Sequence, residues 1–189
     1  KKKDILKILQ DKKVWILAFY AAFIVGSVMS AFAETYSVII LEKIKHFSSH
    51  HAAWLSSMII LGVGVGAPLQ GLISAKFKNK ANWLIIASII TLLIYVIIIA
   101  YIYSNQTPDL IAIVYFLLGF FVSTSLLVFT IGKESHANEH QGIIFALINM
   151  MIGLGGFFIP FIFGEIINIF SASIITSALF LSIPMIIAV

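Results

Sequence analysis

Six apolar stretches run along these 189 residues, and each is long enough to cross a lipid bilayer. A bilayer core of roughly 30 Å needs about 20 consecutive apolar residues in an α-helix. Because 61% of the residues are hydrophobic and 11% are charged, a water-soluble domain could not bury this much apolar surface. The stretches lack strict alternation and are about twice as long as barrel strands. The chain is therefore predicted to be an all-α, polytopic membrane helix bundle.

The chain is predicted to have two parts, an amphipathic linker over residues 1–13 and a transmembrane domain over residues 14–189. In the linker, isoleucine and leucine share one helical face and lysine the other, which is typical of a helix at a membrane interface. The connections between spans are too short for a soluble catalytic domain, so any function lies within the bundle. The six transmembrane helices are predicted at about 14–41, 52–74, 82–103, 109–131, 141–167 and 172–189.

The lysines predict how the chain is oriented in the membrane. Most of them precede the first span, separate spans two and three, or separate spans four and five, and these three places lie on one side of the membrane. By the positive-inside rule that side is cytoplasmic, so the N-terminus is expected in the cytoplasm. Lysine as the only basic residue and abundant isoleucine are typical of an AT-rich bacterial genome. The bacterial inner membrane is therefore the expected location.

Several kinds of chemistry are excluded by what the sequence lacks. The net charge of +4 is a topology signal, and the arginines favoured for phosphate recognition are missing, so no nucleic-acid partner is expected. The chain has no cysteine, which excludes disulfides, thiol catalysis and thiolate metal sites. His46, His50 and His51 share a loop without an acidic residue at ligand spacing, so no metal is expected there. No catalytic motif is present, and neither an enzyme nor a cofactor is predicted.

Spans two and five both contain glycine and proline, which interrupt helices. Interruptions at equivalent places in two groups of three helices indicate a transporter built from repeats. The prolines free backbone carbonyls and permit bending, while the glycines let backbones approach closely. Close packing alone would also explain the glycines. The predicted packing and hinge residues are Gly62, Gly66, Pro68, Gly153, Gly156 and Pro160.

Polar residues are distributed unevenly over the six spans. Spans three and six are almost purely apolar, as expected of helices that face lipid on most sides. Spans one, two, four and five carry the small and polar residues, as expected of helices that line a cavity. The order cavity, cavity, lipid therefore occurs twice. The fold is predicted to be a 3+3 inverted repeat.

The first span carries polar residues at steps of three, four and seven, which predict a single helical face for Tyr20, Ser27, Ser30, Glu34 and Ser37. Glu34 is the most informative of them, because an intramembrane carboxylate is costly and indicates function. Two interpretations stay open. Glu34 is either buried, with a raised pKa that suits a proton carrier, or hydrated at the outer interface.

Two further polar positions lie deep in other spans. Asn149 in span five either binds substrate or forms a hydrogen bond between helices. Ser123 lies near the middle of span four, where a hydroxyl often bonds only to a carbonyl of its own helix. The predicted substrate and proton pathway consists of Tyr20, Ser27, Ser30, Glu34, Ser123 and Asn149.

Span two and the loop that follows it resemble helix eight of a major facilitator superfamily transporter. That loop usually reads Gly-x-x-x-Asp-Arg/Lys-x-Gly-Arg-Arg/Lys, and Gly71, Lys76 and Lys80 fit it, while Ala75 and Lys78 replace its aspartate and second glycine. The segment from Glu134 through the glycines and proline of span five is similar to the approach to helix eleven. The resemblance implies a cytoplasmic gate loop with Gly71, Lys76, Lys80 and Glu134.

Members of that family have twelve helices and bind substrate between two six-helix halves. The resemblance therefore implies that this chain is the C-terminal half, with the N-terminal six-helix half, the lipid bilayer and a small-molecule substrate as partners. The expected function is secondary active transport by alternating access, a proton-coupled symport of a nutrient, an amino acid or a drug-like compound. Few charges face the pathway, which favours neutral, zwitterionic or weakly cationic solutes. The alternative is a half-size membrane protein that acts as a channel or packing scaffold, for example as a homodimer.

Overall fold

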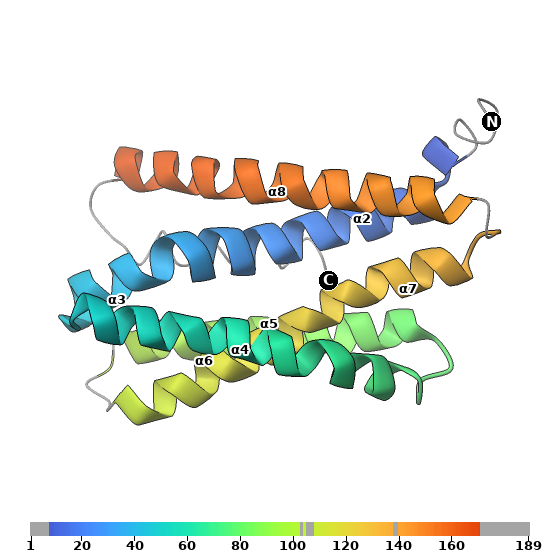
Figure 1. The fold of residues 1–189 in the computed structure, drawn as a ribbon. Helices are drawn as coiled ribbons and strands as arrows, with labels where there is room; N and C mark the ends of the chain where they lie inside the picture. The colour runs from blue at the N-terminus through green and yellow to red at the C-terminus, as the bar shows by residue number, and fades with distance from the viewer. Residues whose placement is uncertain (1–7, 103, 105–107, 138–139, 171–189) are drawn as a thin grey trace.

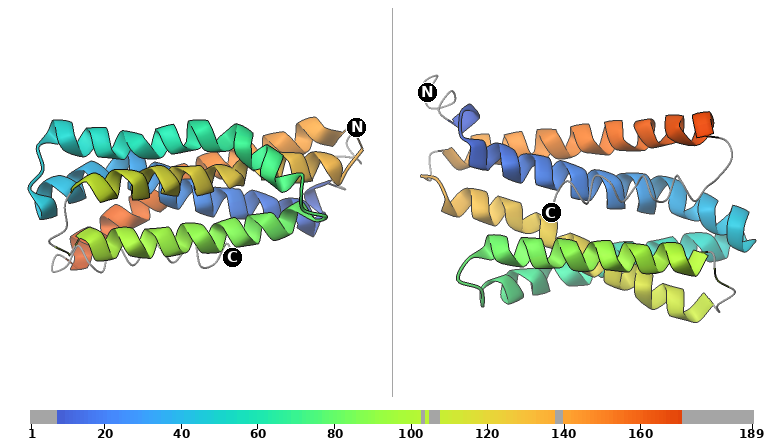
Figure 2. Two further views of the ribbon diagram at one scale, coloured as in Figure 1. Left: turned by 90° about the horizontal axis from the view of Figure 1, so that it is seen from below. Right: turned by 180° about the vertical axis from the view of Figure 1, so that it is seen from behind.

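A computed structural model describes residues 8–102, 104, 108–137 and 140–170. Within these ranges the chain is helical and contains no strand, and five helices are long and apolar enough to cross a membrane. The helices lie alongside one another as an elongated bundle (Figures 1 and 2). The prediction of an all-α membrane helix bundle is confirmed. The sixth predicted span, residues 172–189, lies outside the described residues.

The first and fourth spans are each built from three helical segments, whereas the others are single α-helices. The five spans consist of α2 (Lys12–Ile24), η1 (Val25–Tyr36) and α3 (Ser37–Lys45); α4 (Ser49–Ser74); α5 (Lys80–Ile102); α6 (Pro108–Val122), η2 (Ser123–Leu126) and α7 (Leu127–Glu134); and α8 (Gln141–Phe170).

Short polar residues mark where these apolar helices begin and end. Asp11 caps α2 by accepting a hydrogen bond from the Lys13 N–H at 2.8 Å, and Ser48 caps α4. His46 follows α3 with a left-handed φ of 55°, a conformation that often terminates helices. One end of the bundle is called here the near end. It contains the start of α2, the α4–α5 connection and the α7–α8 connection (Figure 1). The α3–α4 connection lies at the opposite, far end.

Close backbone contact joins α4 to α6. A Cβ atom on Gly119 would lie 1.9 Å from the carbonyl oxygen of Ile59, and one on Gly62 would lie 2.1 Å from that of Phe116. Gly66 continues this contact one turn further along α4, where its Cβ would lie 2.4 Å from Ser123 Oγ. Only glycine allows the two backbones to approach this closely. These contacts are called the α4–α6 seam.

A second close contact joins α8 to the first span. A Cβ on Gly155 would lie 2.4 Å from the carbonyl oxygen of Ala22, and one on Gly26 would lie 2.7 Å from that of Gly155. These residues form the α2–α8 seam, which continues along η1. The two seams together contain the most extensive contacts between helices in the described part of the chain. The α2–α8 pair and the helices α4, α5 and α6 can be followed in Figure 1.

The helical irregularities lie in other spans than the sequence predicts. Pro68 and Pro160 are inside α4 and α8, which continue as α-helices on both sides of them, so the expected breaks in spans two and five are not observed. Membrane helices tolerate proline when neighbouring groups satisfy the freed backbone. The interruptions are instead the π-helix η1 in span one and the 3₁₀-helix η2 in span four. Both kinds of segment are frequent at functional sites or hinges.

The α4–α6 seam predicts opposite effects for the same substitution at two glycines. Gly119→Ala should destabilise the protein by about 1–3 kcal/mol, because the new methyl group forces the two helices apart. Gly64→Ala should leave stability unchanged or raise it by up to about 1 kcal/mol, because its Cβ would meet nothing within 4 Å and alanine favours helix. Thermal unfolding in detergent measures both variants. Equal shifts in Tm would show that the seam does not limit stability.

Candidate functional site

The polar residues of the first span do not share one face. The Tyr20 hydroxyl lies 2.8 Å from the Ser88 hydroxyl on α5, whereas Ser37 lies 2.6 Å from the Ser56 hydroxyl on α4. Ser30 lies beside α8, where a Cβ on Gly156 would be 3.0 Å from its hydroxyl oxygen. The expectation of a single face assumed an α-helical period. The π-helix η1 bonds residue i to i−5, which rotates successive side chains away from that period.

The other predicted pathway residues differ in exposure. Glu34 on η1 and Asn149 on α8 are exposed on the surface of the bundle. Ser27 and Ser123 are buried, and their hydroxyls donate to carbonyls of their own helices, those of Phe23 and Phe120. The carboxylate and the amide are therefore available to a neighbouring surface, whereas the two serines satisfy local backbone groups.

Tyr20 also lines a groove between α2 and α5. This groove has a volume of about 810 Å³, and its lining is almost entirely apolar. Trp15 and Lys12 lie on the same groove towards the near end, and Leu84 and Ile85 form part of its α5 side. The Tyr20 hydroxyl, through its hydrogen bond with Ser88, joins α2 to α5.

The predicted hinge residues of α8 lie in two environments. A Cβ on Gly153 would meet nothing within 4 Å, whereas Gly156 faces Ser30. The Pro160 carbonyl accepts a hydrogen bond from the Tyr36 hydroxyl at 3.1 Å, at the point where η1 ends. The π-helical segment and the proline of α8 are therefore in direct contact.

Gln70 joins three helices near the α4–α6 seam. Its side chain is 1% exposed, and its Nε2 donates to the Phe120 carbonyl at 2.9 Å. Its Oε1 accepts a hydrogen bond from Trp83 Nε1 at 2.8 Å, which brings in α5. The Ser123 hydroxyl, at the first residue of η2, donates to the same Phe120 carbonyl. A buried amide with both ends bonded holds α4, α5 and α6 together. The sequence pattern did not single it out as a site residue, although a glutamine within an apolar span is a signal.

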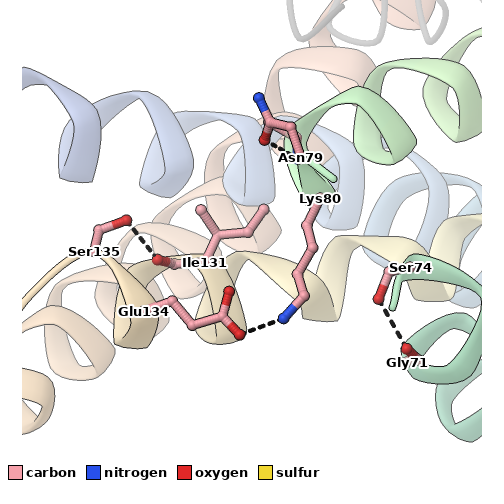
Figure 3. Close-up of polar contacts among 8 residues, drawn as sticks. Gly71, Ser74, Asn79, Lys80, Ile131, Glu134 and Ser135 are labelled. Carbon is pink, nitrogen blue, oxygen red and sulfur yellow. Dashed lines mark hydrogen bonds and ion pairs between the residues drawn. The ribbon is translucent and has the colours of Figure 1, made fainter. Parts of the chain in front are cut away.

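The predicted gate-loop residues lie at the near end, and Figure 3 shows Gly71, Lys80 and Glu134 there. Lys80 at the start of α5 and Glu134 at the end of α7 point towards each other and form an ion pair. Gly71 accepts a hydrogen bond from the Ser74 hydroxyl at 2.9 Å at the end of α4, and Lys76 is exposed in the following loop. Two of the four predicted gate residues are thus in direct contact, across a long separation in sequence.

A second pair at the near end joins residues that the sequence did not place in a site. Asp11 Oδ2 lies 2.9 Å from His136 Nε2, which connects the start of α2 to the α7–α8 connection. The pKa of Asp11 is lowered from its ordinary value, chiefly by the hydrogen bond from the Lys13 N–H and secondly by His136. No local pattern marks this pair, because the two residues meet only after the chain has crossed the membrane four times.

No group of three or more histidine, cysteine, aspartate or glutamate side chains that could hold a metal ion occurs in the described part of the chain. The polar groups of the bundle are instead scattered hydroxyls and amides within the spans and ion pairs at the near end. This arrangement suits positioning and movement of helices.

Comparisons with known proteins agree with this arrangement. A family model described as Major Facilitator Superfamily matches residues 8–189. A comparison with curated proteins found no match. Because the family match covers nearly the whole chain, and its described part is a bundle of membrane-length helices, this chain belongs to the Major Facilitator Superfamily of membrane transporters.

Proposed function

We propose that this chain is the C-terminal six-helix half of a secondary transporter that moves a small solute by alternating access, driven by protons. The solute binds between this half and an N-terminal six-helix half. The near end faces the cytoplasm, and the membrane is the bacterial inner membrane. Neutral, zwitterionic or weakly cationic solutes such as nutrients, amino acids or drug-like compounds fit the small number of charges within the spans.

The two glycine seams carry this proposal. The spacing in sequence between Gly26 and Gly119 equals the spacing between Gly62 and Gly155. Gly26 and Gly155 form one seam, and Gly62 and Gly119 form the other. An exchange of span one with span four and of span two with span five therefore converts one seam into the other. This correspondence supports the 3+3 inverted repeat on which alternating access is built in many transporters.

The irregular helices support the same assignment. The π-helix η1 and the 3₁₀-helix η2 lie in spans one and four, which the repeat makes equivalent. Broken helices at equivalent positions are typical of transporter pathways. Spans one and four are also the two that line the central pathway by the family resemblance. Movement of one half against the other requires helices that bend, and η1 and η2 supply such points.

The position of Glu34 supports its role in the pathway. The first span, Lys12–Lys45, has 34 residues and is about 51 Å long at the α-helical rise, so a core of about 30 Å centred on it encloses Glu34. Glu34 is exposed on the surface of this half. A carboxylate that faced lipid within this core would be costly, by up to about 2.5–3.5 kcal/mol at the helix centre. Glu34 therefore faces water or the other half, as a proton carrier must.

The ion pair between Lys80 and Glu134 supports a gate at the near end. It ties α7, which follows the irregular segment η2, to the first turn of α5. If α7 moves as a rigid body about η2, the contact between Lys80 and Glu134 would break when the cytoplasmic side opens and form when it closes. The pair is partly exposed, at 24% and 55% of the two side chains, so it can exchange with water at modest cost.

Glu34→Gln should abolish uptake driven by a pH gradient, because the amide keeps the shape of the side chain and cannot carry a proton. Solute uptake into proteoliposomes containing the whole transporter, with and without a pH gradient and over a panel of solutes, measures this. Glu165→Gln is the matched control, because Glu165 is exposed at the far end of α8 and should be dispensable. Undiminished proton-driven uptake by Glu34→Gln would show that Glu34 is not the proton carrier. Ion conductance without solute uptake would favour the alternative of a channel.

Lys80→Glu should change the uptake rate by up to about fivefold, because loss of a partly exposed ion pair shifts the gate equilibrium by about 1 kcal/mol. The double variant Lys80→Glu with Glu134→Lys restores the opposite charges and should recover most of the native rate. Lys78→Glu changes the same charge on an exposed loop residue and should have little effect. If the double variant is no better than Lys80→Glu alone, the two residues do not form the gate contact.

A further inference from the structure

The segment that leads into the first span is packed against the bundle. Ile8 is 2% exposed and belongs to a buried cluster with residues of α7 and α8, among them Leu127, Val128 and Ile144. The carbonyl of Leu9 accepts a hydrogen bond from Trp15 Nε1 at 2.8 Å. Residues 8–11 are called here the N-terminal strap; its Ile8 and Asp11 line a cavity with Ser135, His136 and His140, so the strap lies beside the α7–α8 connection.

The hydrogen bond between Asp11 and His136 is the polar contact that closes this strap. Asp11 uses one carboxylate oxygen to cap α2 and the other to contact His136 Nε2 at 2.9 Å. The other ring nitrogen of His136, Nδ1, is buried without a hydrogen-bond partner in the described residues. Asp11 is thus the imidazole's one polar partner there. A cavity of about 370 Å³, lined by the pair and by Ile8, Ser135, Ala137 and His140, adjoins the contact.

Other charged or titratable side chains surround the contact between Asp11 and His136. Lys13 lies close to Asp11 at the start of α2. His140, which precedes α8, lines the same cavity as Asp11 and His136. Three charged residues are close to His136 in the sequence. Lys133 is exposed, Glu134 is paired with Lys80, and Glu139 lies outside the described residues.

The carboxylate is charged throughout the neutral range. The Lys13 N–H, and then His136, hold the pKa of Asp11 below its ordinary value, so its contribution is lost only as the pH falls through that lowered pKa. Histidine is the side chain that changes charge between about pH 5 and 8. A neutral imidazole can still donate its Nε2–H to the carboxylate, and a protonated imidazole adds the attraction between opposite charges to that hydrogen bond.

We propose that Asp11 and His136 form a pH-sensitive latch, which holds the N-terminal strap on α7 and α8 when His136 is protonated and loosens it when His136 is neutral. The latch restrains the same end of α7 that Lys80 holds from the other side. Its consequence for transport rests on the proposed function: acidification of the cytoplasm would restrain α7 and slow opening of the near end. The latch itself is a property of the folded chain and is measured without transport.

The test uses the reactivity of single cysteines, which this chain permits because it has none of its own. In the membrane-embedded protein, with any other cysteines removed, Ile8→Cys reports on the buried face of the strap, and Gln10→Cys is the exposed reference. The ratio of their maleimide labelling rates cancels the intrinsic pH dependence of the thiol. Labelling at position 8 relative to position 10 should rise about two- to fivefold from pH 6 to pH 8, the size expected of a partly exposed ion pair.

Three variants test whether the pH dependence comes from the ion pair itself. His136→Gln and Asp11→Asn should give fast labelling at position 8 at both pH values, because each removes one charge, while asparagine still caps α2. His140→Gln should keep the native pH dependence. A pH dependence that survives in His136→Gln, or that disappears in His140→Gln, would overturn the proposal, as would unchanged protection in Asp11→Asn.

A label-free measurement keeps the test valid if Ile8→Cys disturbs packing. At pH 6, amide hydrogen exchange over residues 8–15, measured relative to the α4–α5 connection, should be about two- to fivefold faster in His136→Gln and Asp11→Asn than in the native protein. Equal exchange in all three proteins would also overturn the latch. Neither measurement involves Glu34, so failure of the latch and failure of proton-driven transport are distinguished.

Discussion

Direct contact between helix backbones at two glycine seams is the constraint on which this bundle depends. Lipid is as apolar as leucine, so the hydrophobic effect does little to bring membrane helices together, and close packing must do so. At Gly62 and Gly119 the α4 and α6 backbones are too close for any Cβ, and Gly26 and Gly155 bring η1 and α8 together in the same way.

The α4–α6 seam places the polar groups near it. Gln70 lies on the seam face of α4, one turn beyond Gly66, and therefore meets the Phe120 carbonyl at the point where α6 gives way to η2. Trp83 donates to the same amide and thereby positions the start of α5. Lys80, one turn before Trp83, then reaches Glu134 across the near end. The seam, the buried amide and the surface ion pair form a continuous connection from the bundle interior to the proposed gate.

The near end of the bundle can respond to charge through the contacts that hold α7. Two ion pairs hold the end of α7, one to α5 and one to the segment before α2. Surface ion pairs contribute little to stability, so their arrangement is better suited to conformational balance than to holding the fold together. In the proposed transporter, α7 pivots at η2. Protonation of His136 would strengthen its contact with Asp11 and leave the contact between Lys80 and Glu134 unchanged.

Much of the architecture could be predicted because its causes are local in sequence. Length and apolarity of each run determine that the chain is an all-α membrane bundle, and the small residues Gly62 and Gly66 mark a packing face because glycine has no Cβ. The family resemblance placed Lys80 and Glu134 in one predicted gate loop, but it did not predict the ion pair between them. The failures have a physical cause as well. Proline removes one donor, which neighbouring helices can tolerate, so α4 and α8 are not broken. The π-helical register of η1 scatters a face that an α-helical period would have kept together.

By itself, the sequence determined that this protein is a set of helices of membrane length in lipid, because a helix satisfies its backbone hydrogen bonds internally where no water is available. Only the tertiary structure decided which helices touch and which charges meet. The contact of Gly26 with Gly155 and that of Asp11 with His136 join residues far apart in the chain. Such contacts depend on how whole helices cross, and no local residue pattern encodes that crossing.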